Sequence, residues 1–182
     1  MKRLFAITTV LVLSSAIFFV AAGAGADMVT KPVKGKWSGI DYAMGFCTNG
    51  AIQSVNLGKG VSTGIGASDI LSVSCLYCSN DPNDPSCESS GWMIVTAANG
   101  DALHLDSYAT IGMSSGEWEE VEEVVGGTGR FKDATGLLTT KGNFMLPSDP
   151  DLFPFDADPS IPPSLLQPPS FWVGTTDGWI TY

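Results

Sequence analysis

The sequence predicts an all-β fold of eight antiparallel strands, arranged as a closed barrel or as a sandwich. Three observations predict it. Strand-forming β-branched and aromatic residues occur in short runs, the runs are separated by Gly, Asn, Asp and Pro, and no long segment has a clear helical period. Eight such runs without helices between them are typical of these two architectures.

The first 26 residues have the features of a secretory signal peptide. Lys2 and Arg3 precede an apolar run, residues 4–20, and the small residues of an AGA sequence end at Ala26. We therefore expect cleavage after Ala26, a single domain over residues 27–182, and a secreted or periplasmic protein. A retained membrane anchor is the alternative, disfavoured because the apolar core is short and no basic cluster follows it.

The net charge of the chain disfavours nucleic acid and anionic membrane surfaces as partners. The 182 residues have a formal net charge of −10. Lys2 and Arg3 leave with the signal peptide. The exported part then has seven basic and 19 acidic residues, which gives it a net charge of −12. Such a surface repels phosphate backbones and anionic lipids, so we expect no nucleic-acid partner and no membrane insertion after signal removal.

The first strand, residues 36–46, has a clear period of two. Ile40, Tyr42, Met44 and Phe46 share one face, and small or polar residues occupy the other. If the apolar face points inward, these four side chains line a barrel cavity, and they are our candidate ligand-binding residues. The other predicted strands are residues 51–57, 61–76, 91–98, 102–111, 117–125, 135–146 and 171–182.

The sixth segment, EWEEVEEVV at residues 117–125, is ambiguous. Trp118, Val121 and Val125 have helical spacing, and Glu is a good helix former. A strand with a bulge also accounts for the broken alternation. We favour the strand because a glycine-rich hairpin turn follows at once.

An up-and-down order of strands would sort the connections into two ends. Short glycine-rich turns, residues 58–60, 99–101 and 126–130, fall at one end. The elaborate connections fall at the other, which is where we expect function. These are residues 47–50, 78–90, 112–116 and the insertion 147–170.

The insertion 147–170 holds eight of the eleven prolines together with apolar residues. A connection this long is usually a lid, a binding loop or disordered. Because exposed phenylalanines have a solvation cost, we expect Phe153 and Phe155 to pack on the barrel mouth or against a partner, with disorder as the alternative.

Four cysteines in an exported chain indicate two disulfides. Cys78 and Cys87 flank a short proline-containing loop, and Cys47 and Cys75 fall at the same end of the fold, so we expect Cys78–Cys87 and Cys47–Cys75. A redox pair formed by Cys75 and Cys78 would need a helix at this point, and a zinc site is disfavoured by an oxidising compartment.

Two polar groups are candidates for chemistry. His104, the only histidine, shares a strand face with Asp106 and Tyr108, an arrangement that permits acid–base work. The alternative, which we favour, is that this polar face is the wet outer surface. The 80–88 loop supplies oxygen ligands suited to calcium, although solvated turn carboxylates are the commoner outcome; these residues are Asp81, Asn83, Asp84 and Glu88.

The stretch VVGGTGRFKDATG, residues 124–136, has four glycines but is not a phosphate loop. A phosphate loop continues into a helix, whereas ATGLLTTKGNF after it is typical of a strand. The glycines instead suit a barrel corner, with Phe131 tucked under the barrel floor and Arg130 and Lys132 solvated.

This stretch resembles the signature of the allene oxide cyclase and dirigent barrels and of exported bacterial proteins similar to them. The resemblance covers roughly residues 91–182 and implies a closed, calycin-like, eight-stranded barrel. Plant relatives include a cyclase and proteins that steer radical coupling, but we match no catalytic position of theirs to this chain. The matching residues are Gly126, Gly127, Thr128, Gly129, Phe131, Ala134 and Gly136.

Two functions remain open from the sequence. The first is an exported, non-catalytic barrel that holds an apolar small molecule or a protein partner at its loop-rich rim. The second is an isomerase or cyclase acting in an apolar cavity. A self-associating coat component is a third possibility. We expect no cofactor, because no cofactor motif or metal set is present in the sequence.

Overall fold

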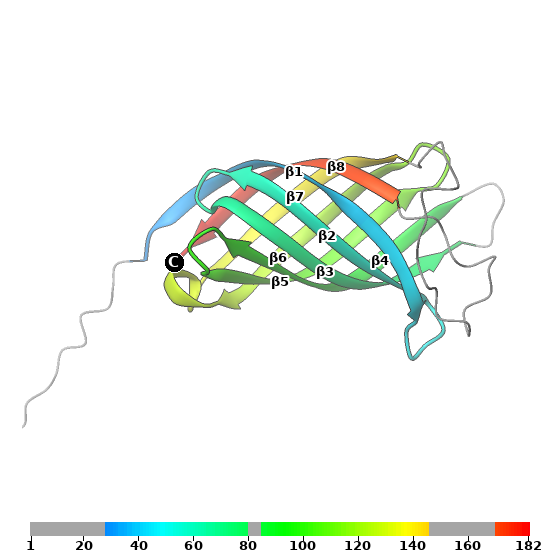
Figure 1. The fold of residues 1–182 in the computed structure, drawn as a ribbon, viewed down its shortest axis with the longest axis horizontal. Coiled ribbons are helices and arrows are strands. Elements are labelled where there is room, and N and C mark those ends of the chain that lie inside the picture. The colour runs from blue at the N-terminus through cyan, green and yellow to red at the C-terminus, as the bar shows by residue number, and fades with distance from the viewer. Residues whose placement is uncertain (1–27, 80–84, 146–169) are drawn as a thin grey trace, which may run out of the picture.

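The computed structural model describes residues 28–79, 85–145 and 170–182. Its eight strands pair antiparallel in chain order, and the last pairs with the first, so the predicted barrel is closed (Figure 1). Within the described residues, no helix is long and apolar enough to cross a membrane. The strands are β1 (Thr30–Phe46), β2 (Ile52–Ser62), β3 (Gly66–Cys78), β4 (Ser86–Ala97), β5 (Ala102–Gly112), β6 (Glu117–Gly127), β7 (Thr135–Met145) and β8 (Ser170–Thr181).

Each strand alternates between the barrel interior and the outer surface. In β5, Leu103, Leu105 and Ala109 are buried, whereas His104 and Tyr108 are exposed. The ambiguous sixth segment is a strand, and its register shifts at a bulge beside Val124. This bulge lies beyond the alternating part of the strand: inward and outward positions alternate without a break from Trp118 to Val124, and two of the inward positions hold Glu120 and Glu122.

The connections divide between the two ends of the barrel as the strand order predicts. Residues 63–65, 98–101 and 128–134 form the end where the C-terminus lies (Figure 1). The β1–β2 and β5–β6 connections lie at the opposite end, together with the attachment points of the undescribed segments 80–84 and 146–169. We call this second end the loop-rich rim.

The turn predicted at residues 58–60 was wrong, because the β2–β3 connection lies at residues 63–65. Gly58 and Gly60 instead lie inside β2, where tryptophan rings occupy the space of a side chain. A Cβ atom on Gly58 would lie 2.6 Å from Trp172 Cζ2, and one on Gly60 would overlap Trp37 Cε3. These glycines give room to the interior rings and do not form a turn.

The glycine-rich stretch closes the floor of the barrel. Thr128 exchanges two hydrogen bonds with Ala102, through its backbone N–H and its side-chain oxygen. A short 3₁₀ turn, η1 (Gly129–Phe131), then places Phe131 in the interior, where it is 0% exposed and packs edge-on against Tyr182. Arg130 and Lys132 are both exposed, as expected, and Arg130 is also anchored because its Nη2 donates to the Ile65 carbonyl over 2.7 Å.

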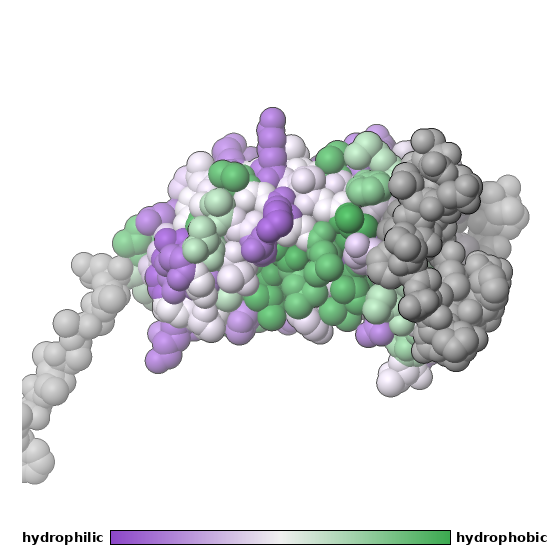
Figure 2. All heavy atoms as spheres, viewed as in Figure 1, coloured by the Kyte–Doolittle hydropathy of each residue, from purple (hydrophilic) through white to green (hydrophobic). Residues whose placement is uncertain are grey.

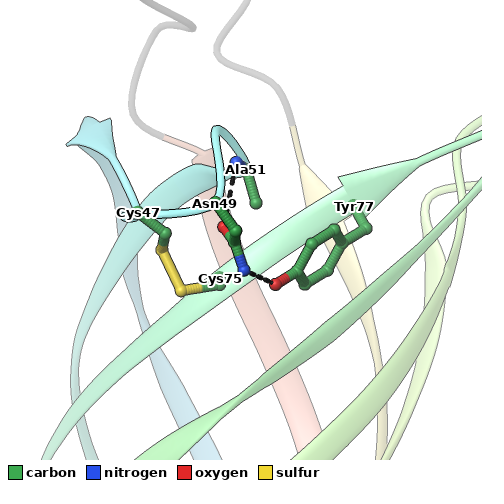
Figure 3. Close-up of a disulfide and its surroundings, with 5 residues drawn as sticks. All are labelled: Cys47, Asn49, Ala51, Cys75 and Tyr77. Carbon is green, nitrogen blue, oxygen red and sulfur yellow. Dashed lines mark hydrogen bonds between the residues drawn. A yellow bond between two sulfur atoms is a disulfide. The ribbon is translucent and has the colours of Figure 1, made fainter.

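Both predicted disulfides are confirmed, and both lie at the loop-rich rim. Cys78–Cys87 joins paired positions of β3 and β4. Cys47–Cys75 joins the β1–β2 turn to β3, and Asn49 reinforces the turn by accepting from the Ala51 N–H and donating to the Tyr77 hydroxyl (Figure 3). The loop closed by Cys47–Cys75 spans a sequence separation of 28 residues, and in the chain-entropy picture its closure stabilises the fold by about 3 kcal/mol.

Substitution of the floor glycines tests the structural role of this stretch. A Cβ on Gly127 would overlap the Ala102 carbonyl oxygen, and Gly129 has a φ of +55°. Gly127→Ala and Gly129→Ala should each lower the free energy of unfolding by about 1–3 kcal/mol, measured by chemical denaturation. The matched control is Gly112→Ala, whose Cβ would meet only the Ser115 hydroxyl at 2.8 Å and no backbone atom as closely. Equal stability of all three variants would contradict this role.

Candidate functional site

The barrel encloses a cavity of about 360 Å³ that extends to the loop-rich rim. Its walls include side chains from all eight strands, and the β5–β6 connection lines it through residues 112–116. A volume of this size is in the range of small-molecule sites. The cavity is therefore the candidate functional site.

Three carboxyl side chains line the cavity. Asp41 comes from β1, and Glu120 and Glu122 come from β6. Glu122 is only 4% exposed. No Lys, Arg or His belongs to the part of the cavity lining that the structure describes. Among the described lining residues, the carboxyl groups thus have neutral neighbours and no basic partner, and Glu122 has the like charge of Glu120 beside it.

A chain of three hydrogen bonds ends on Glu122. Trp37 Nε1 donates to Thr176 Oγ1 over 2.6 Å, the two threonine hydroxyls are 2.5 Å apart, and Thr140 Oγ1 donates to Glu122 Oε1 over 2.7 Å. Since the Thr140 proton is used on Glu122, the Thr176 hydroxyl must be the donor between the two threonines. Every donor in the chain thus points toward the carboxyl group.

Burial raises the pKa of all three cavity carboxyl groups. For Glu122 the pKa rises from 4.5 to about 8, first because of burial and second because of the like charge of Glu120, against the hydrogen bond from Thr140. Burial also raises the pKa of Glu120, against a hydrogen bond from Ser107. The pKa of Asp41 is raised by burial as well, although the Ser54 hydroxyl donates to it.

Aromatic rings form another part of the cavity wall. Trp118 and Trp172 meet edge to face with ring centroids 6.1 Å apart, and Phe144 lies 5.9 Å from Trp118. The Nε1 atoms of Trp118 and Trp172 are buried and have no hydrogen-bond partner among the described residues. The ring edge next to each Nε1 packs against glycine backbone, at Gly39 for Trp172 and at Gly142 for Trp118, so these rings give the cavity apolar surface.

This combination supports two kinds of chemistry. A carboxyl group that keeps its proton near neutral pH can donate a hydrogen bond or act as a general acid. The aromatic walls and the row of small hydroxyl residues suit a molecule with an apolar body and a few polar groups. These hydroxyl residues are Ser54, Ser72, Ser74, Ser89 and Ser170.

The candidate residues of β1 do not line the cavity, so their predicted placement was wrong. The interior face of β1 is the one with Gly39 and Asp41, because the Trp172 ring lies where a larger residue at 39 would place its side chain. Ile40 instead lines an outer groove with Leu57 and Phe171. Figure 2 shows that apolar residues gather on part of the outer barrel wall.

The remaining three residues of that set lie apart from the cavity as well. Tyr42 is on the same outer face as Ile40, and Met44, beside a register shift in β1, is 57% exposed. Beyond the shift, Phe46 pairs with Ile52 at the rim and is 47% exposed. Phe153 and Phe155 lie outside the described residues.

The polar face around His104 is the outer surface, as favoured from the sequence. His104, Asp106 and Tyr108 are all exposed, so they do not meet the cavity carboxyl groups. Among the described residues, no group of three or more His, Cys, Asp or Glu side chains could hold a metal ion. Of the proposed calcium ligands, Glu88 is exposed on β4, and Asp81, Asn83 and Asp84 lie outside the described residues.

Sequence reasoning missed the cavity carboxyl groups, although a signal for them exists. Strand alternation in EWEEVEEVV places Glu120 and Glu122 on the same face as Trp118 and Val124. Both apolar residues are buried, so the two glutamates between them are drawn to the interior. The helical spacing of other residues in the segment concealed this pattern.

The comparisons with known proteins assign no family. No protein-family model matches the chain, and no curated protein is significantly similar to it. The resemblance to allene oxide cyclase and dirigent proteins therefore stays a prediction, whereas the barrel itself is observed.

The raised pKa of Glu122 makes a prediction about stability. Between pH 4.5 and about 8, the folded state keeps a proton that the unfolded state loses, so Glu122 makes the protein less stable as the pH rises through this window. Gln at this position keeps an acceptor for Thr140 and cannot ionise. Glu122→Gln should therefore stabilise the protein relative to wild type by about 1–3 kcal/mol more at pH 8 than at pH 5.

Urea denaturation at the two pH values measures this difference. Glu123→Gln is the matched control, because Glu123 is the exposed neighbour on the same strand. A pH-independent difference between wild type and Glu122→Gln would contradict the raised pKa.

Proposed function

We propose that this protein is an exported barrel that binds a small molecule in its interior, at the end formed by the loop-rich rim. The observation that carries the proposal is the cavity of about 360 Å³, which combines tryptophan walls with hydroxyl and carboxyl groups. A core formed only for stability would be filled with apolar side chains to crystal-like density. The interior of this barrel instead leaves a cavity between its side chains and places ionisable groups in the cavity wall.

Export is proposed on two grounds. Residues 1–26 have the composition of a signal peptide, and both disulfides are of a kind that persists in oxidising compartments. The resemblance of residues 124–136 to allene oxide cyclase and dirigent barrels supports a role for the barrel interior. A protein partner at the rim remains part of the proposal. It is supported by the apolar residues of the insertion 147–170, which we expect to pack on the barrel mouth or against a partner.

A second candidate function is a proton-transfer isomerase or cyclase, favoured by one observation. The pKa of Glu122 near 8 leaves this carboxyl group protonated at neutral pH, which is the state a general acid needs. Turnover of a bound molecule that is lost in Glu122→Gln, without loss of binding, would establish this function. Binding without turnover leaves the carrier function in place.

Filling the cavity tests the binding site. Ala109 lines the cavity from β5 and is 7% exposed, whereas its neighbour Thr110 points outward. We expect N-phenyl-1-naphthylamine, a neutral fluorescent probe, to bind the wild-type protein saturably. Ala109→Phe should weaken this binding by about tenfold or more, since a phenyl ring occupies the site, and Thr110→Phe should leave it unchanged.

Thermal melting of both variants checks that each is folded. Equal probe affinity in a folded Ala109→Phe protein would place the binding site elsewhere. Absence of saturable binding by the wild-type protein would contradict an accessible apolar cavity.

A further inference from the structure

We propose that the molecule bound in the barrel is an organic cation, an ammonium group attached to an apolar or aromatic body. The inference rests on the proposed small-molecule function and names its ligand class. It is carried by the placement of Asp41, Glu120 and Glu122 around one cavity that is walled by tryptophan rings.

The first argument is the charge balance of the cavity. Asp41 on β1 and Glu120 and Glu122 on β6 are the titratable groups among its described lining residues. The described linings from β2, β3, β4, β5, β7, β8 and the 112–116 connection are apolar, hydroxyl or amide groups. Because none of the described lining residues is basic, these carboxyl groups ionise at low cost only when a counter-charge enters the cavity, and a bound ammonium group supplies it.

The second argument is the aromatic wall. Trp37, Trp118 and Trp172 all line the cavity, and tryptophan is the side chain whose ring face attracts a cation most strongly. An apolar or aromatic ligand body also packs well against these rings. Acidic groups alone would suit many cations, including hydrated metal ions, whereas the rings favour an organic one.

The net charge of the exported chain works in the same direction. Its formal net charge of −12 attracts cations toward the protein and repels anions. A fatty-acid anion would meet this field and then the three cavity carboxyl groups. The structure therefore selects against anionic ligands at both stages.

Three matched probes test the inference. These are 3-phenylpropylamine, which is a cation at neutral pH, 3-phenylpropan-1-ol, which is neutral, and 3-phenylpropanoate, which is an anion. We expect calorimetric titration of the disulfide-bonded protein at pH 7.5 to show that the amine binds about tenfold or more tighter than the alcohol, and that the anion binds most weakly.

Two variants locate the effect. Glu122→Gln should reduce the preference for the amine over the alcohol by about tenfold and leave the affinity for the alcohol nearly unchanged. Glu123→Gln removes a carboxylate that is exposed on the outer face of the same strand, next to Glu122 in the chain. It removes an acidic side chain outside the cavity and should leave the preference unchanged.

The pH dependence gives an independent readout. Because the pKa of Glu122 is raised to about 8, binding of an ammonium group must displace its proton at lower pH. Amine affinity should therefore rise between pH 6 and 8, with a proton released on binding, and alcohol affinity should not rise.

The outcomes separate the two proposals. Alcohol or anion binding as tight as that of the amine would overturn the cation inference and leave small-molecule binding standing. Binding of none of the three probes in the millimolar range would overturn both.

Discussion

The interior of this barrel depends on the hydrogen bond from Thr140 to Glu122, because the strand geometry forces an acidic side chain inward and this bond gives it a partner. In a closed barrel every second residue of each strand faces inward, and no sheet edge is free to absorb a shift of register. β6 therefore brings Glu122 into the interior together with Trp118. The hydrogen-bond chain from Trp37 through Thr176 and Thr140 ends on the carboxyl group of Glu122. Its aligned donors offset part of the free energy that burial of this group costs.

Tryptophan and glycine share the remaining interior space. The rings of Trp37 and Trp172 lie over glycines of β1 and β2, where no side chain would fit. These large rings pack against glycine backbone at the barrel wall, so they do not fill the centre of the barrel. The floor is sealed by Phe131, so the unfilled volume lies toward the loop-rich rim, which both disulfides reinforce.

Much of the fold follows from local patterns in the sequence. Eight runs of strand-forming residues predict eight strands, and their order predicts which connections share an end, which in turn predicts the pairing of Cys47 with Cys75. The inward face of β1 could not be predicted, because it depends on Trp172, a residue of the last strand that is distant in the chain. Burial of Glu122 likewise depends on hydroxyl groups from β7 and β8.

The protonation state of Glu122 tests this account most directly. Carboxyl ¹³C chemical shifts of glutamate-labelled protein, followed from pH 4 to 10, report it, and the signal lost in Glu122→Gln identifies the residue. The account predicts a Glu122 carboxyl that stays protonated at pH 7 and titrates near pH 8, coupled to Glu120. Titration near pH 4.5, as for an ordinary exposed glutamate, would contradict the buried acidic site.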